Sequence, residues 1–159
     1  MRKRSGYVYY EAGQAVAAAH LGLTIRRISG NPAESASEIV LPRGDLKARL
    51  ILWLTAVAAE SKGAGQSDPL RRMRNRQRIT SHMQAVIASL PGTPTKRQAA
   101  ATRLRAQAQD RANAICADLY DAIERVADVI EKQGSVTGPE VEEIVIAVKK
   151  ASRNGRKSS

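Results

Sequence analysis

Few side chains in this chain of 159 residues could bind a metal or carry a proton. Groups of that kind are carboxylates, imidazoles and thiols. The chain has two histidines, His20 and His82, and a single cysteine, Cys116. Its carboxylates include Glu11, inside a segment with helical periodicity, and Asp68, which directly precedes a proline. What these residues can do together depends on the elements that carry them.

The spacing of apolar residues predicts helices over residues 8–22, 46–62, 69–90, 95–133 and 137–151. The stretch 95–133 can be read as one helix or two, and its unbroken helical spacing favours one. Two β-branched stretches, 24–29 and 37–41, predict a small hairpin or sheet edge. The fold is therefore expected to be mainly α with a small β hairpin or sheet. We expect a single domain over 1–151 and a basic, disordered tail over 152–159.

The first predicted helix carries a pattern known from a peptidase family. Residues Tyr9–Val16 read Tyr-Tyr-Glu-Ala-Gly-Gln-Ala-Val, which resembles the Tyr-His-Glu-Ala-Gly-His-Ala-Val helix of the FtsH-type zinc peptidases. In that family two histidines at i and i+4 hold zinc from one helix face, and the glutamate activates the metal-bound water. The resemblance implies that Tyr10 and Gln14 occupy the ligand positions and that Glu11 occupies the position of the general base.

Two further segments extend the resemblance, which covers roughly residues 7–72. Leu54–Glu60 is similar to the family's Leu-x-Gly-x-x-Ala-Glu helix, with Ala56 in place of the glycine. Gly63–Asp68 is similar to its Gly-Ala-x-x-Asp loop, and the family's third zinc ligand corresponds to Asp68. The resemblance implies a zincin-like peptidase-domain fold of the FtsH type. We expect the ATPase module and membrane anchor of full-length members to be absent.

The departures from the pattern argue against a zinc centre. A catalytic zinc needs three protein ligands, whereas the amide of Gln14 is a weak donor and the phenol of Tyr10 must lose a proton of pKa near 10 to bind well. His20 lies ten residues beyond Tyr10, about 15 Å along a helix. His82 and Asp68 together supply only two ligands. We therefore expect zinc to be absent and Glu11 to be a vestige of the general base.

Each of these positions also has an ordinary structural explanation. Tyr10 and Gln14 can hydrogen-bond to each other or fill the vacated site. Glu11 can be a solvated or hydrogen-bonded helix residue. Asp68 can cap the helix that starts at Pro69, a favoured pairing. Near a helix end, His20 is expected to be a cap or core group. Cys116, between apolar neighbours, is expected to be a buried and inert thiol.

A basic stretch follows the loop. Residues 69–109 contain nine Lys or Arg and no acid, including five arginines close together: Arg71, Arg72, Arg74, Arg76 and Arg78. One interpretation is a site for an anion such as nucleic-acid phosphate. The other is a solvated helix that pairs with the acidic stretch 110–143, which holds nine acids and three basic residues. The pairing would form within the molecule or across a dimer.

Composition adds expectations about the environment. The formal charge of +11 favours acidic partners. With one cysteine no internal disulfide can form, which favours a reducing compartment. No run of about 18 apolar residues exists, so we expect a soluble, cytoplasmic protein without a transmembrane segment. We expect a monomer or a dimer.

Three functions remain open at this point. The first is a catalytically inactive peptidase-like protein, a pseudoprotease, that acts as a protein-binding or regulatory module. The second is a basic nucleic-acid-associated regulatory protein. The third is a metallopeptidase with a rebuilt, non-standard metal site, which would need Glu11 as base and a ligand from His82 or another subunit.

Overall fold

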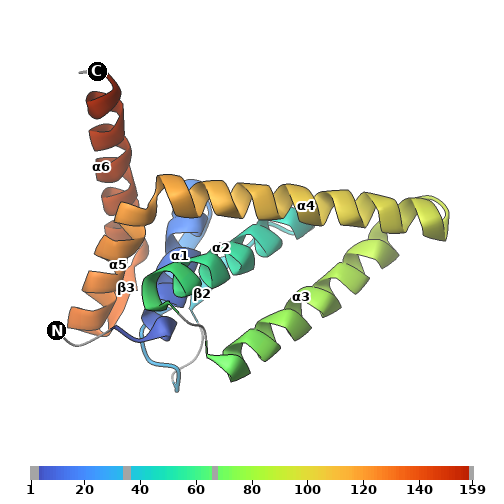
Figure 1. Ribbon diagram of the computed structural model, residues 1–159, viewed down its shortest axis with the longest axis horizontal. Helices are drawn as coiled ribbons and strands as arrows, with labels where there is room; N and C mark the ends of the chain where they lie inside the picture. Colours follow the sequence, from blue (N-terminus) through green and yellow to red (C-terminus); the bar gives the residue numbers. More distant parts are fainter. Residues whose placement is uncertain (1–3, 34–36, 66–67, 158–159) are drawn as a thin grey trace.

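The computed structural model describes residues 4–33, 37–65 and 68–157. Within these ranges the chain is mainly helical and has a small three-stranded antiparallel sheet (Figure 1). This confirms the expected mainly α fold with a small β element. The helices are α1 Gly6–His20, α2 Leu46–Ala64, α3 Pro69–Ser89, α4 Pro94–Asp118, α5 Tyr120–Gln133 and α6 Gly138–Lys157. The strands are β1 Thr24–Ser29, β2 Glu38–Val40 and β3 Ser135–Thr137.

Helix α1 lies at the centre of the fold. The side chain of Ser5 caps its first turn, accepting a hydrogen bond from the amide of Val8 at 3.4 Å. The chain leaves the helix through Gly22, whose φ of 71° suits glycine. Ten of its 15 residues are buried, because α1 contacts α2, α4, α5, α6 and β1. The motif segment is therefore enclosed on nearly all sides.

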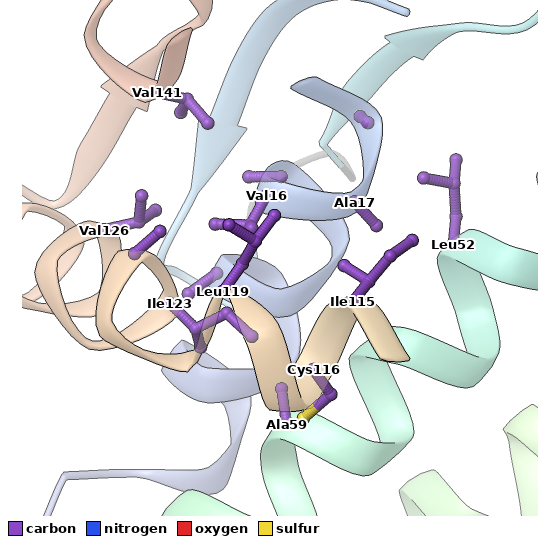
Figure 2. Close-up of a cluster of buried hydrophobic side chains, with 14 of the residues drawn as sticks. Val16, Ala17, Leu52, Ala59, Ile115, Cys116, Leu119, Ile123, Val126 and Val141 are labelled. Atoms are coloured by element: carbon purple, nitrogen blue, oxygen red, sulfur yellow. The ribbon is translucent and has the colours of Figure 1, made fainter. Parts of the chain in front are cut away.

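Helices α1 and α2 approach closely at Gly13. A Cβ atom built at this position would lie 2.6 Å from the Cβ of Ala59, which is too close for any residue except glycine. The small residues on both helices bring the backbones together, and larger aliphatic side chains fill the space around them. Figure 2 shows this core, in which Val16 of α1 lies near Ile123 of α5 and Leu119, the residue between α4 and α5.

The sheet has the order β2-β1-β3, and both pairings are antiparallel. The β1–β2 hairpin confirms the strands predicted over 24–29 and 37–41. The third strand escaped prediction because it has three residues and lies between two helices. It is held by pairing with β1, where Val136 lies opposite Ile28 and both side chains are buried.

The prediction of one helix over 95–133 was wrong. The chain breaks at Leu119, where φ is −116° and ψ is 23°, and α5 turns steeply away from α4 (Figure 1). The apolar spacing continues across the break because both helices, and Leu119 itself at 4% exposure, face one core. The spacing of apolar residues indicates only which side of each helical turn is buried. A bend that leaves the same side facing the core therefore does not change the pattern.

Helix α6 begins with reciprocal hydrogen bonds between Thr137 and Glu140. The Glu140 carboxylate accepts from the amide of Thr137 at 2.8 Å, and the amide of Glu140 donates to the Thr137 hydroxyl at 3.5 Å. The helix continues to Lys157. Residues 152–157, predicted to be disordered, are therefore helical and exposed, and 158–159 lie outside the described residues.

Helix α3 leans away from the rest of the molecule. It begins, as predicted, with Asp68 as its cap and Pro69 in its first turn. Only Asn75, Ile79 and Val86 of this helix are buried. Figure 1 shows α3 and α4 as the arms of a hairpin that opens from the turn at 90–93. The start of α3 returns to α1, and a hollow forms between the two helices.

Candidate functional site

A pocket of about 480 Å³ lies between the start of α1 and the first half of α3. Its wall contains Tyr7, Tyr10, Glu11, Pro32, Asp68, Leu70, Arg71, Arg74, Asn75 and Arg78. Three of the four positions singled out by the motif, Tyr10, Glu11 and Asp68, thus meet in one place. The fourth, Gln14, is half-buried one turn further along α1 and is not part of this wall.

Tyr10 is joined to the opposite side of the pocket. Its hydroxyl donates a hydrogen bond to Oδ1 of Asn75 at 3.0 Å, and both residues are 4% exposed. Burial raises the pKa of Tyr10 to about 12, although Arg78 beside it acts in the opposite direction. The phenol therefore stays protonated at neutral pH. The hydrogen-bond partner of Tyr10 is thus Asn75 of α3.

Glu11 is buried, at 4% exposure, and is not solvated. It accepts a hydrogen bond from the hydroxyl of Ser37 and has Tyr7 as a second hydrogen-bonding neighbour. Burial raises the pKa of Glu11, and these hydrogen bonds together with Arg71 and Arg78 offset only part of that effect. The carboxyl group is held in place by its neighbours, as the hydrogen-bonded alternative predicts.

Asp68 acts as a helix cap. Its Oδ1 accepts hydrogen bonds from the amides of Leu70 at 2.8 Å and Arg71 at 3.3 Å. The amide of Arg71, and then that of Leu70, lower the pKa of this carboxylate. Oδ2 lies 3.7 Å from Nη2 of Arg71. The capping role accounts for one oxygen of Asp68, and the ion pair with Arg71 uses the other.

Glu60 lies behind Arg71 and escaped the sequence analysis as a site residue. It is 1% exposed, and its Oε1 is 3.4 Å both from Nε of Arg71 and from the amide of Asp68. Burial raises the pKa of Glu60, and Arg71 is the first of the groups that oppose this effect. The signal in the sequence was a carboxylate near the end of the strongly apolar helix α2, since such a group needs a buried partner.

The five clustered arginines divide into two faces of α3. At 100° per residue, Arg71, Arg74 and Arg78 fall within about 60° of one another, while Arg72 and Arg76 point the opposite way. The first three line the pocket and the other two do not. The sequence alone does not determine which face of α3 meets α1, so all five arginines were candidates for anion binding.

Arg74 and Arg78 also border a second hollow, of about 520 Å³, on the side facing α2. His82 and Trp53 lie there with ring centroids 5.6 Å apart, edge to face. Nε2 of His82 is 2.8 Å from the carbonyl oxygen of Leu46. His82 therefore belongs to the contact between α3 and α2 and does not line the pocket with Asp68.

The remaining candidates lie elsewhere. His20 is at the far end of α1, in a separate pocket of about 320 Å³, and its Nε2 is 3.3 Å from Nη2 of Arg111. Burial lowers the pKa of His20, with further contributions from Lys149 and Arg111. Cys116 is a buried free thiol, and burial raises its pKa. Neither residue reaches the pocket between α1 and α3.

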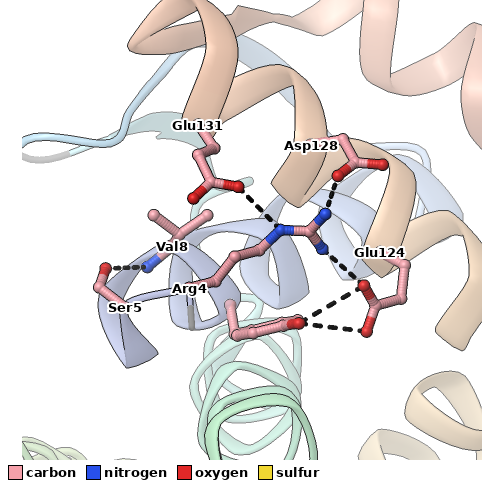
Figure 3. Close-up of polar contacts among 7 residues, drawn as sticks. Arg4, Ser5, Val8, Glu124, Asp128 and Glu131 are labelled. Carbon is pink, nitrogen blue, oxygen red and sulfur yellow. Dashed lines mark hydrogen bonds and ion pairs between the residues drawn. The ribbon is translucent and has the colours of Figure 1, made fainter. Parts of the chain in front are cut away.

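The acidic stretch does not neutralise the α3 arginines within the described residues. Its carboxylates Glu124, Asp128 and Glu131 surround Arg4 at the other side of α1 (Figure 3). Nε of Arg4 is 2.9 Å from Glu131, Nη1 is 2.6 Å from Glu124, and Nη2 pairs with Asp128. The intramolecular form of the predicted pairing was therefore wrong, because the three acids lie on the face of α5 that meets the N-terminal segment.

The chain has no recognisable relative among known families and curated proteins, and its described part has no metal cluster and no membrane-spanning helix. No model of a protein family and no curated protein matches the chain. In the described ranges, no three His, Cys, Asp or Glu side chains lie close enough to hold a metal ion together. None of the helices that the structure describes has the length and hydropathy needed to cross a bilayer.

Proposed function

We propose that the protein is a catalytically inactive peptidase-like protein that acts by binding another protein or by regulating one. The observation that carries the proposal is the state of Tyr10. At the position where the FtsH-type motif has its first zinc-binding histidine, a buried phenol donates a hydrogen bond to Oδ1 of Asn75. Burial raises the pKa of this phenol to about 12, so it stays protonated at neutral pH and is a poor metal ligand.

The donor set does not fit a catalytic zinc. Such a centre takes three protein ligands and leaves a fourth position for water. Tyr10 is protonated and hydrogen-bonded, and Asp68 caps α3 and pairs with Arg71. Gln14 can offer only a neutral amide oxygen. Arg71, Arg74 and Arg78 line the same wall, and their positive charges would repel a metal cation bound there.

The zincin-like, FtsH-type fold is part of the proposal. Its support is the meeting of Tyr10, Glu11 and Asp68 in one pocket, although Asp68 is 57 positions from Glu11 in the chain. The resemblance places the same three positions around one site. The close packing of Gly13 against Ala59 adds support, because it joins the two segments in which the resemblance is strongest.

The test is the amount of metal bound per chain, measured by elemental analysis after purification without chelator. We expect the natural protein to hold none and the variant Tyr10→His/Gln14→His to take up about one zinc. Adding Asp68→Asn to that variant should reduce the zinc uptake. Adding Glu142→Gln instead should leave the uptake unchanged, because Glu142 is an exposed residue of α6. About one zinc in the natural protein, lost in Asp68→Asn, would overturn the proposal.

Nucleic-acid binding is the second candidate. The observation that favours it is the hollow beside α2, in which Trp53 lies with Arg49, Arg74 and Arg78, since aromatic and cationic groups together bind single strands. Binding of an oligonucleotide should weaken steeply between low and physiological salt. The rebuilt metallopeptidase gains no support, because His82 bonds to the Leu46 carbonyl in this second hollow.

A further inference from the structure

The pocket between α1 and α3 holds hydrogen-bond donors that have no partner. Nδ2 of Asn75 and Nη1 of Arg71 are buried and unpaired within the described part of the chain. Both residues line the pocket, and Asn75 is 4% exposed. A buried donor without an acceptor is unfavourable, because it has lost its hydrogen bonds to water without replacing them. Two such donors in one wall indicate that the pocket is shaped for a ligand that accepts hydrogen bonds.

The charges of the wall favour an anion. Arg71 is neutralised by Glu60 behind it and by Asp68. Arg74 and Arg78 are exposed, and among the described residues no carboxylate lies within ion-pair distance of either. Glu11 is bound to Ser37 and is buried below them. Two guanidinium groups therefore stand at the mouth of the pocket without a carboxylate partner among the described residues, although Arg78 also hydrogen-bonds to Tyr10. The forked donors of a guanidinium match the geometry of a carboxylate.

The rim of the pocket gives the ligand a second property. Leu70, 62% exposed, is part of the wall. A large apolar side chain exposed beside a charged hollow is typical of a surface that receives a peptide. A nucleic-acid backbone would instead need a continuous basic track and gains nothing from Leu70.

We propose that this pocket binds the carboxylate of an acidic side chain in a partner protein, with Arg74, Arg78 and Asn75 as donors and Leu70 against a neighbouring apolar residue. This inference rests on the proposed function, since it assigns the pseudoprotease its kind of partner.

The test is an NMR titration of the ¹⁵N-labelled protein at physiological salt. The probe is the amidated peptide Ala-Leu-Glu-Glu-Leu-Ala, and the control is the same peptide with Gln in place of Glu. We expect the acidic peptide to shift amides that line the pocket and to bind about tenfold or more tightly than its neutral control. Equal binding of the two peptides, or none by either, would overturn the inference.

Variants on the two faces of α3 provide a matched comparison. Arg74→Gln/Arg78→Gln and Arg72→Gln/Arg76→Gln remove the same charge from the same helix, but only the first pair lines the pocket. We expect the first to weaken binding of the acidic peptide about tenfold or more and the second by about threefold or less. An equal loss in both would show a diffuse attraction and would overturn the proposed site.

Asn75→Asp tests the floor of the pocket. It keeps an acceptor for Tyr10 but replaces the unpaired donor with a carboxylate oxygen, so binding should fall about tenfold or more with the fold intact by circular dichroism. Unchanged binding would remove Asn75 from the site. A single-stranded oligonucleotide that shifts the same amides more strongly than the acidic peptide would assign the pocket to nucleic acid instead.

The two proposals fail separately. Metal content is measured on the same sample before the titration. Bound zinc would overturn the inactive-peptidase proposal whatever the peptide does. A metal-free protein that does not bind the acidic peptide would overturn only the proposal that the pocket binds a carboxylate.

Discussion

Replacing Tyr10 with phenylalanine tests the contact on which the proposed function depends. The variant keeps the ring in the core and removes one hydroxyl, which donates to Asn75 at 3.0 Å. Nδ2 of Asn75 is already unpaired, so the variant leaves the whole amide without a partner in a site that is 4% exposed. A buried polar group without a partner is unfavourable by about 1–3 kcal/mol, and only the Oδ1 end of the amide newly loses its partner, so we expect a loss of about 1–3 kcal/mol.

The assay is thermal unfolding followed by circular dichroism. For a chain of this length, 1 kcal/mol corresponds to about 2–4 °C in Tm, so Tyr10→Phe should lower Tm by about 2–12 °C. Tyr9→Phe is the matched control on the neighbouring residue. Its hydroxyl lies 3.3 and 3.4 Å from the oxygens of Glu124, whose side chain is 37% exposed. We expect this control to lose less than about 1 kcal/mol.

A double-mutant cycle with Asn75→Ala isolates the contact itself. Once Asn75 is gone, Tyr10→Phe no longer leaves an unpaired amide, so the second substitution should be milder than the first by at least about 1 kcal/mol. Effects that add within about 0.5 kcal/mol would refute the reasoning. So would equal losses in Tyr10→Phe and Tyr9→Phe, since a hydroxyl bonded to the buried Asn75 and one near the half-exposed Glu124 would then be equivalent.

Three further predictions follow from other contacts. Burial raises the pKa of Glu11 above its usual 4.5, so the folded protein keeps this proton to higher pH than the unfolded chain and loses stability as pH rises through that window. Glu11→Gln, which does not ionise, should therefore gain Tm relative to the natural protein as pH is raised from 4.5, and a constant difference would contradict this. Arg4→Gln leaves the acids of α5 without their shared cation and should lower stability by about 1 kcal/mol at low salt and by less in 1 M NaCl; a salt-independent loss would point to packing. Cys116 should resist a thiol reagent in the folded protein and react fully after denaturation, because it is buried and burial raises its pKa; rapid labelling of the folded protein would place the thiol at the surface.

The sequence alone determined the features that depend on neighbouring residues. Asp68 followed by Pro69 marked the start of α3, and the structure has the aspartate bonded to the first free amides of that helix. Gly134 marked the end of α5, where φ is 79°. Thr137 predicted the start of α6, which its hydroxyl caps. Caps and turns of this kind involve atoms a few positions apart, so the local residue types decide them.

The bend at Leu119 and the strand β3 depended on the rest of the molecule. Nothing between Ile115 and Ile123 interrupts the helical pattern, and the bend forms because α5 must pack against α1 as well as follow α4. Three residues of β3 are too few to form a strand alone, and they do so because β1 offers an edge. Both features follow from contacts between distant segments.

The same division holds for the candidate site. The motif identified Tyr10, Glu11 and Asp68 from residue types and order, and the pocket brings them together. Only the tertiary structure paired Tyr10 with Asn75, 65 residues away, set Glu60 behind Arg71, and separated the α3 arginines into a face that lines the pocket and a face in solvent. Residue type limits what chemistry a side chain can offer, whereas burial, partner and charge are set by whichever distant segment packs against it.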